Sequence, residues 1–77
     1  MDFKFEFSKQ AIKFLKKQDL PTRKRIYKAI SDLPNGDVKK LINRRGFRLR
    51  VGDFRIIYDQ YGNIIEIFEI NNRGQIY

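Results

Sequence analysis

The sequence contains no cysteine and no histidine among its 77 residues. Without cysteine the chain cannot form disulfides, and without either residue type the usual zinc ligand sets cannot be built. The lack of histidine also excludes catalytic Ser-His-Asp and Cys-His sets. No apolar run approaches the roughly 20 residues that a membrane-spanning helix needs. The first ten residues alternate phenylalanine with charged residues, which is not the pattern of a signal peptide.

These absences, together with the length, predict a single cytoplasmic domain over residues 1–77 that needs no cofactor or metal. What the chain has in excess is positive charge. Seventeen Lys and Arg stand against nine Asp and Glu, which gives a net charge of +8. Residues 39–55 alone hold seven basic residues and one acidic residue. A field concentrated in this way suits a polyanion such as RNA or DNA, or an acidic protein partner.

Two amphipathic segments predict helices, one over residues 9–18 and one from about residue 22 to residue 33. Ser8 precedes the first segment and suits a helix N-cap, because its hydroxyl accepts a bond from a free backbone N–H. The QDLPT stretch interrupts the helical pattern between the two segments. Because this connection is short, the two helices are expected to form an antiparallel hairpin.

Alternating apolar and polar residues predict strands at residues 2–7 and in the segments FRLRV, FRIIYD and IIEIFEI. The turn signals GD and QYGN separate the last three strands, as in an antiparallel meander. Residues 38–46 show no clear period and are expected to form a loop with room for a short strand. The predicted fold is therefore α+β with the order β-α-α-β-β-β. An N-terminal helical hairpin packs on one face of a mainly antiparallel four-stranded sheet.

Three arginines interrupt strands that are otherwise apolar. Arg48 and Arg50 project from the face opposite the core side chain Leu49, and Arg55 lies beside them if the strand register is favourable. Like charges this close repel by on the order of 1 kcal/mol per pair, whereas arginine binds phosphate with two parallel hydrogen bonds. The pattern therefore indicates an anion site, although a merely solvated strand face would explain it as well.

The segments FSKQAIKFLKKQ, RKRIYKAISDL, FRLRVGDFRIIYD and NNRGQIY together resemble the RelE/ParE superfamily of toxins from type II toxin–antitoxin systems. The resemblance covers nearly the whole chain, and FRLRVGDFRIIYD is its most specific part. RelE-type toxins cut mRNA in the ribosomal A site without a metal, through attack of the 2′-hydroxyl on the adjacent phosphate. By position, the resemblance implies that the catalytic residues are Arg48, Arg50, Arg55, Arg73 and Tyr77.

The resemblance also implies partners: mRNA on the ribosome, and a cognate antitoxin that binds the basic segment. Two other functions stay open, because ParE-like toxins of the same fold inhibit DNA gyrase without cutting RNA, and a degenerate toxin would do neither. One departure is Asn72, which stands where the terminal motif of the superfamily commonly has histidine. Glu66 and Glu69 are three residues apart and are expected on opposite faces of the last strand, so a carboxylate pair is not expected.

Overall fold

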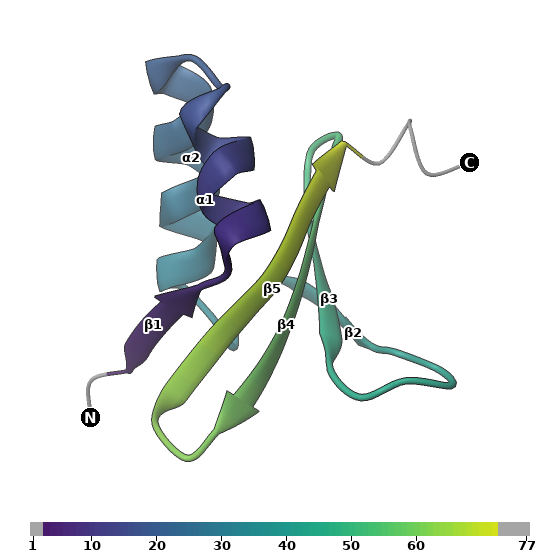
Figure 1. The fold of residues 1–77 in the computed structure, drawn as a ribbon. Coiled ribbons are helices and arrows are strands. Elements are labelled where there is room, and N and C mark those ends of the chain that lie inside the picture. Colours follow the sequence, from purple (N-terminus) through teal and green to yellow (C-terminus); the bar gives the residue numbers. More distant parts are fainter. Residues whose placement is uncertain (1–2, 73–77) are drawn as a thin grey trace.

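The strands form a sheet in the order β1-β5-β4-β3-β2, with both helices on one face (Figure 1). A computed structural model describes residues 3–72 of the chain, so Arg73 and Tyr77 lie outside the described residues. The elements are β1 (Lys4–Phe7), α1 (Lys9–Lys16), α2 (Leu20–Ser31), β2 (Asp37–Lys40), β3 (Phe47–Val51), β4 (Phe54–Tyr61) and β5 (Ile64–Asn72).

The α+β class and the helical hairpin on one sheet face are confirmed. The sheet has five strands rather than the four predicted, because Asp37–Lys40 forms β2 and pairs antiparallel with β3. Only four residues long, β2 carries charge at three of its positions, so its sequence has no detectable period. The first strand joins the sheet as expected and runs parallel to β5, while all other pairs are antiparallel.

Both helices begin with a side-chain cap. The Ser8 hydroxyl accepts a hydrogen bond from the Ala11 N–H at 3.1 Å, which confirms the predicted N-cap of α1. The Asp19 carboxylate accepts one from the Thr22 N–H at 2.9 Å, and hydrogen bonding to Thr22 lowers the pKa of Asp19. Helix α2 starts two residues earlier than predicted, because Pro21 sits within the first turn, where its missing N–H costs nothing.

The core lies between the helices and the inner face of the sheet. Isoleucine supplies most of the sheet side, where Ile56, Ile65 and Ile67 are completely buried. The remaining buried members of the cluster are Ala11, Leu15, Ile26, Ile30, Leu33, Leu49, Tyr58 and Ile70. Because the two helices cover only one face, the side chains on the other face remain without a covering layer. We call this second face, formed by β2 to β5, the open face.

A β-bulge in β5 changes which side chains reach the open face. Ile57 pairs with Glu69, but its neighbour Tyr58 pairs with Ile67, so Phe68 has no partner in β4. The alternation of inward-facing and outward-facing side chains along β5 therefore shifts by one residue at the bulge. As a result, Glu66 and Glu69 both project from the open face, and the prediction that they point to opposite faces was wrong.

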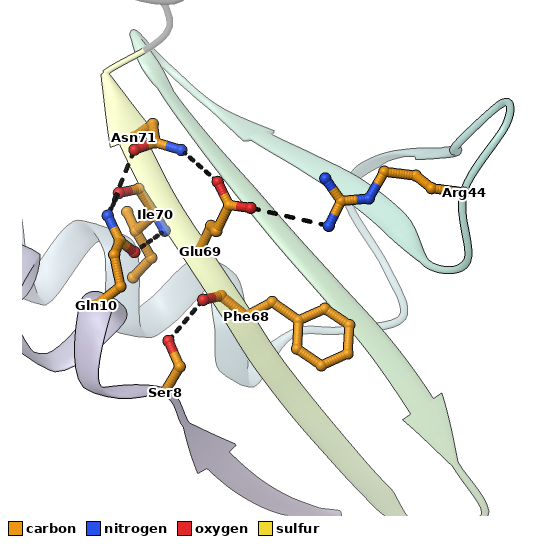
Figure 2. A network of polar contacts seen from close by, with 7 residues as sticks. All are labelled: Ser8, Gln10, Arg44, Phe68, Glu69, Ile70 and Asn71. Atoms are coloured by element: carbon orange, nitrogen blue, oxygen red, sulfur yellow. Dashed lines mark hydrogen bonds and ion pairs between the residues drawn. The ribbon is translucent and has the colours of Figure 1, made fainter.

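Side chains from the start of α1 close the edge of β5 where β1 ends (Figure 2). The Ser8 hydroxyl donates to the Phe68 carbonyl. The Gln10 amide donates to the Ile70 carbonyl at 3.0 Å and accepts from the Ile70 N–H at 2.9 Å. Gln10 thus offers one donor and one acceptor, as a neighbouring strand would. The bonds tie the first turn of α1 to the end of β5.

We expect Ile56→Ala to lower the free energy of unfolding by about 2–5 kcal/mol, because it leaves a cavity in a core that small helices cannot collapse to fill. The matched control is Ile42→Ala in the loop between β2 and β3, where Ile42 is 82% exposed. That change should stay within about 0.5 kcal/mol of the parent. Urea unfolding of the three proteins measures both values, and equal losses would contradict the assigned core.

Candidate functional site

Two rows of side chains cross the open face from strand to strand. In the first row Lys39 pairs with Arg48, Arg48 with Ile57, and Ile57 with Glu69. In the second row Asp37 pairs with Arg50, Arg50 with Arg55, and Arg55 with Asn71. Cross-strand partners lie about 5 Å apart at Cα and project to the same side. The register therefore places Arg50 directly opposite Arg55, with Arg48 in the adjacent row.

The three predicted arginines differ in their surroundings. The Nε of Arg50 donates to the Asp37 carboxylate at 3.1 Å, and both side chains are well exposed. Arg48 and Arg55 are half-buried near the centre of the face. The Nε of Arg48 is buried and has no hydrogen-bond partner within residues 3–72. A buried guanidinium N–H without an acceptor is costly, and an anion at this point would relieve that cost.

Arg55 separates two hollows on the open face. The first, with a volume of about 240 Å³, we call the basic hollow; it is lined by Lys39, Lys40, Leu41, Ile42, Arg48 and Arg55. The second, of about 300 Å³, we call the glutamate hollow; it is lined by Arg44, Arg55, Ile57, Glu69 and Asn71. Because Arg55 lines both, one guanidinium can contact a group bound in either. The basic hollow has the charge and size for a phosphate.

The loop between β2 and β3 is anchored by a buried carboxylate. Asp59 is 6% exposed and holds the Nε of Arg45 at 3.1 Å from its Oδ2. The Arg45 guanidinium also lies 5.2 Å from the ring centre of Tyr61. Partial burial and a hydrogen bond to the Asp59 carboxylate raise the pKa of Tyr61. These contacts fix the loop that carries Arg44 at the side of the glutamate hollow.

A close backbone contact holds the end of the same loop against the sheet. Gly46 has φ of 115°, and a Cβ at this position would lie 2.8 Å from the Tyr58 carbonyl oxygen. No other residue fits without a shift of the backbone. The Leu41 N–H donates to the Gly46 carbonyl at 3.0 Å and closes the loop. The loop position is therefore set by β4.

Figure 2 shows a polar network that runs from α1 to the open face. The Gln10 amide lies 3.4 Å from the Asn71 Oδ1, and the Asn71 amide donates to the Glu69 Oε1 at 3.0 Å. The Glu69 Oε2 lies 3.8 Å from Arg44, at the edge of the glutamate hollow. Each member restrains the next, so the network fixes the direction of the Glu69 carboxylate.

The structure brings Arg48, Arg50 and Arg55 together on the open face. Arg73 and Tyr77 lie outside the described residues. Sequence reasoning missed Lys39, which belongs to a strand with no visible period, and Glu69, which the bulge brings to the face. The strong positive charge of residues 39–55 was the available signal for Lys39. For Glu69 the sequence offered none.

Within residues 3–72 no group of three or more Asp and Glu side chains is close enough to hold a metal ion. Neither helix in that range has the length and apolar character to cross a membrane. The open face presents guanidinium, ammonium and carboxylate groups. Two guanidiniums beside a phosphate-sized hollow can bind a phosphodiester and stabilise extra negative charge on it.

Comparison with family profiles shows which family the sequence matches. The family profile described as "ParE toxin of type II toxin-antitoxin system, parDE" matches residues 5–77. No curated protein matches the sequence significantly.

Solved structures with the same fold include toxin–antitoxin complexes. The archaeal RelE–RelB complex from Pyrococcus horikoshii OT3 is 25% identical with a TM-score of 0.76, covering 97% of this chain and 99% of that one. The RelB–RelE complex from Methanococcus jannaschii is 29% identical with a TM-score of 0.76, covering 94% of each chain. The YoeB dimer from Staphylococcus aureus, at 24% identity and a TM-score of 0.69, shares the fold over 90% of this chain and 94% of that one.

We expect Arg45→Met to lower the free energy of unfolding by about 1–3 kcal/mol, because it leaves the buried Asp59 carboxylate without its cation. The neighbouring change Arg44→Met breaks only a 3.8 Å pair between exposed side chains and should cost less than about 1 kcal/mol. Denaturant unfolding of both variants tests the difference. If Arg44→Met is the more damaging substitution, Asp59 does not anchor the loop.

Proposed function

This chain belongs to the ParE toxin family of type II toxin–antitoxin systems, and we propose that it acts in the cytoplasm as a metal-independent endoribonuclease that cuts mRNA on the ribosome. The observation that carries the proposal is the placement of Arg48 and Arg55, half-buried, around the basic hollow of the open face. Two RelE proteins at 25% and 29% identity support the RelE side of the superfamily.

The proposed reaction uses the 2′-hydroxyl of the RNA as the nucleophile, so the attacking group comes from the substrate itself. The hydroxyl oxygen attacks the adjacent phosphorus, and the bond to the 5′-oxygen breaks. The products are a 2′,3′-cyclic phosphate and a free 5′-hydroxyl. The phosphorane formed on the way carries extra negative charge, which fixed guanidiniums stabilise in the manner of an oxyanion hole. Arg48 and Arg55 supply this stabilisation in the proposal.

The other predicted site residues take different roles. Arg50 is already paired with Asp37, so we assign it to binding of the flanking RNA backbone rather than to the scissile phosphate. Arginine stays protonated at every biological pH and is unsuited to proton transfer. By resemblance, Arg73 is proposed to stabilise the leaving oxygen, and Tyr77 to stack on a base or exchange a proton.

A second function has support from the family profile itself, whose description names ParE. In that case the open face binds a protein target, DNA gyrase, and no RNA is cut. The two functions share the fold, and the basic face suits both a polyanion and an acidic protein surface.

We expect the parent protein to cut a defined mRNA held on ribosomes at A-site codons, as read by primer extension. Arg48→Ala and Arg55→Ala should each lower the cleavage rate by about 10²–10³-fold, the range for loss of one oxyanion-hole donor. Arg73→Ala and Tyr77→Phe test the two residues carried over by resemblance. Lys24→Ala on α2 removes a similar charge from the helical layer and should cut like the parent.

An intact message combined with inhibition of gyrase supercoiling would replace the nuclease with the ParE-like function. An intact message with no effect on gyrase or on growth would indicate a degenerate toxin.

We also propose a cognate antitoxin, in keeping with the RelE–RelB complexes among the relatives. The charge of residues 39–55 and the two hollows favour an acidic chain that becomes ordered as it binds the open face.

Co-expression with the product of an adjacent small gene should give a complex that persists at salt concentrations that release RNA, because contacts to the apolar Leu41 and Ile42 of the basic hollow are not screened. For single-stranded RNA alone, the logarithm of the binding constant should fall with the logarithm of the salt concentration, with a slope of about −0.7 per phosphate contacted. A complex that dissolves along the same salt curve as RNA would contradict a specific antitoxin interface.

A further inference from the structure

Glu69 is the open-face carboxylate that stands beside the arginines of the proposed site. Within residues 3–72, the other carboxylates on this face have different neighbours. Asp37 is bound by Arg50 at the outer strand, and Asp59 is buried against Arg45. Glu66 lies elsewhere on β5, where Asp59 of β4 is its cross-strand neighbour, and it does not line the glutamate hollow. Glu69 lines that hollow together with Arg44 and Arg55.

The spacing across the face leaves room for a sugar–phosphate unit between Arg48 and Glu69. They flank Ile57 in the same cross-strand row, so their Cα atoms are two strand spacings, about 10 Å, apart. Ile57 is only 3% exposed although it points away from the helices, so its neighbours cover it. A phosphate held by Arg48 and Arg55 would leave the ribose over Ile57, on the side of Glu69.

The carboxylate is held in place and yet open to a ligand. Its Oε1 accepts the Asn71 amide at 3.0 Å, and its Oε2 lies 3.8 Å from Arg44. Asn71 is in turn near Gln10, whose amide is bound at both ends to Ile70 (Figure 2). The Glu69 side chain remains 41% exposed, which leaves a lone pair of Oε2 free to accept a proton from a bound hydroxyl.

The proposed reaction needs such an acceptor, because the 2′-hydroxyl must lose its proton as it attacks. Arginine cannot take that proton, and the chain has no histidine. A tyrosine hydroxyl, with a usual pKa of about 10, is itself protonated at neutral pH, so Tyr77 is less suited to this first step than a carboxylate. A carboxylate is ionised at neutral pH and serves as a general base when it is fixed within hydrogen-bond reach.

We propose that Glu69 is the general base of the cleavage reaction, an inference that rests on the proposed nuclease function. The Glu69 carboxylate takes the proton of the 2′-hydroxyl while the 2′-oxygen of the RNA bonds to phosphorus. The bond from phosphorus to the 5′-oxygen then breaks, and that oxygen takes a proton from water. Glu69 returns its proton to solvent, and the RNA ends carry a cyclic phosphate and a 5′-hydroxyl.

The test compares Glu69→Gln with Glu66→Gln, which makes the same charge change on the same strand and face but outside the glutamate hollow. Single-turnover cleavage of ribosome-held mRNA and binding of a non-cleavable 2′-deoxy oligonucleotide are measured for each protein. Glu69→Gln should lower the cleavage rate by about 10²–10⁴-fold. Its binding should be equal or tighter, since a negative charge has been removed. Glu66→Gln should cut at the parent rate.

If Glu69 had the alternative role of repelling RNA, its substitution would have the opposite effect on the cleavage rate. If Glu69 only repels RNA, Glu69→Gln will cut faster than the parent, and parent-like or faster cleavage overturns the proposal. Glu69→Asp keeps the carboxylate and should retain measurable cleavage, which guards against loss of activity through misfolding. If Glu69→Asp is as inactive as Glu69→Gln while both bind the oligonucleotide, the base is elsewhere. A parent that binds but never cuts overturns the nuclease function and this inference together.

Discussion

The whole molecule depends on the fact that two short helices can cover only one face of a five-stranded sheet. A sheet must bury one face in a core, and here Ile56, Ile65 and Ile67 on the inner face meet α1 and α2. The other face has no such layer, so its side chains must tolerate water. In β3 this division is visible residue by residue, because Leu49 is buried while Arg48 and Arg50 project outward. The polar character of this face is thus a consequence of how little helix the chain contains.

Charge on the open face is balanced at its margins and left in excess at its centre. Asp37 neutralises Arg50 at the outer strand, Asp59 neutralises Arg45 in the loop, and Glu69 lies near Arg44. Arg48 and Arg55 lie between these pairs; both line the basic hollow, and Arg55 lines the glutamate hollow as well. Ion pairs at the rim limit repulsion among the seven basic residues of segment 39–55 without removing the attraction of the centre for an anion.

Local patterns predicted the parts of the structure that local physics decides. Alternation identified β3, β4 and β5, and the two-residue Gly52-Asp53 turn sets the register that brings Arg50 opposite Arg55. The most specific part of the family resemblance, FRLRVGDFRIIYD, lies in β3 and β4. The segment that contains most of β2 was predicted as a loop with room for a short strand, because four mostly charged residues become a strand only through pairing with β3.

The bulge at Phe68 could not be predicted, because it depends on how β5 pairs with β4. The Gln10 contact could not be predicted either, because it joins residues 60 apart in the sequence. The sequence singled out Arg48, Arg50 and Arg55, which the strand register places on one face, whereas the position of Glu69 beside them became visible only in the fold.

The contact between Gln10 and Ile70 also decides how this sheet meets other chains. An unpaired strand edge is a template onto which a foreign strand can add, with aggregation as the extreme result. By occupying both backbone groups of Ile70, Gln10 withdraws the upper part of β5 from such pairing. Within residues 3–72, the edges that stay open to a further strand are the outer edges of β1 and of β2. Of the two, β2 lies beside the arginine face, so backbone pairing there would place a second chain next to the proposed site.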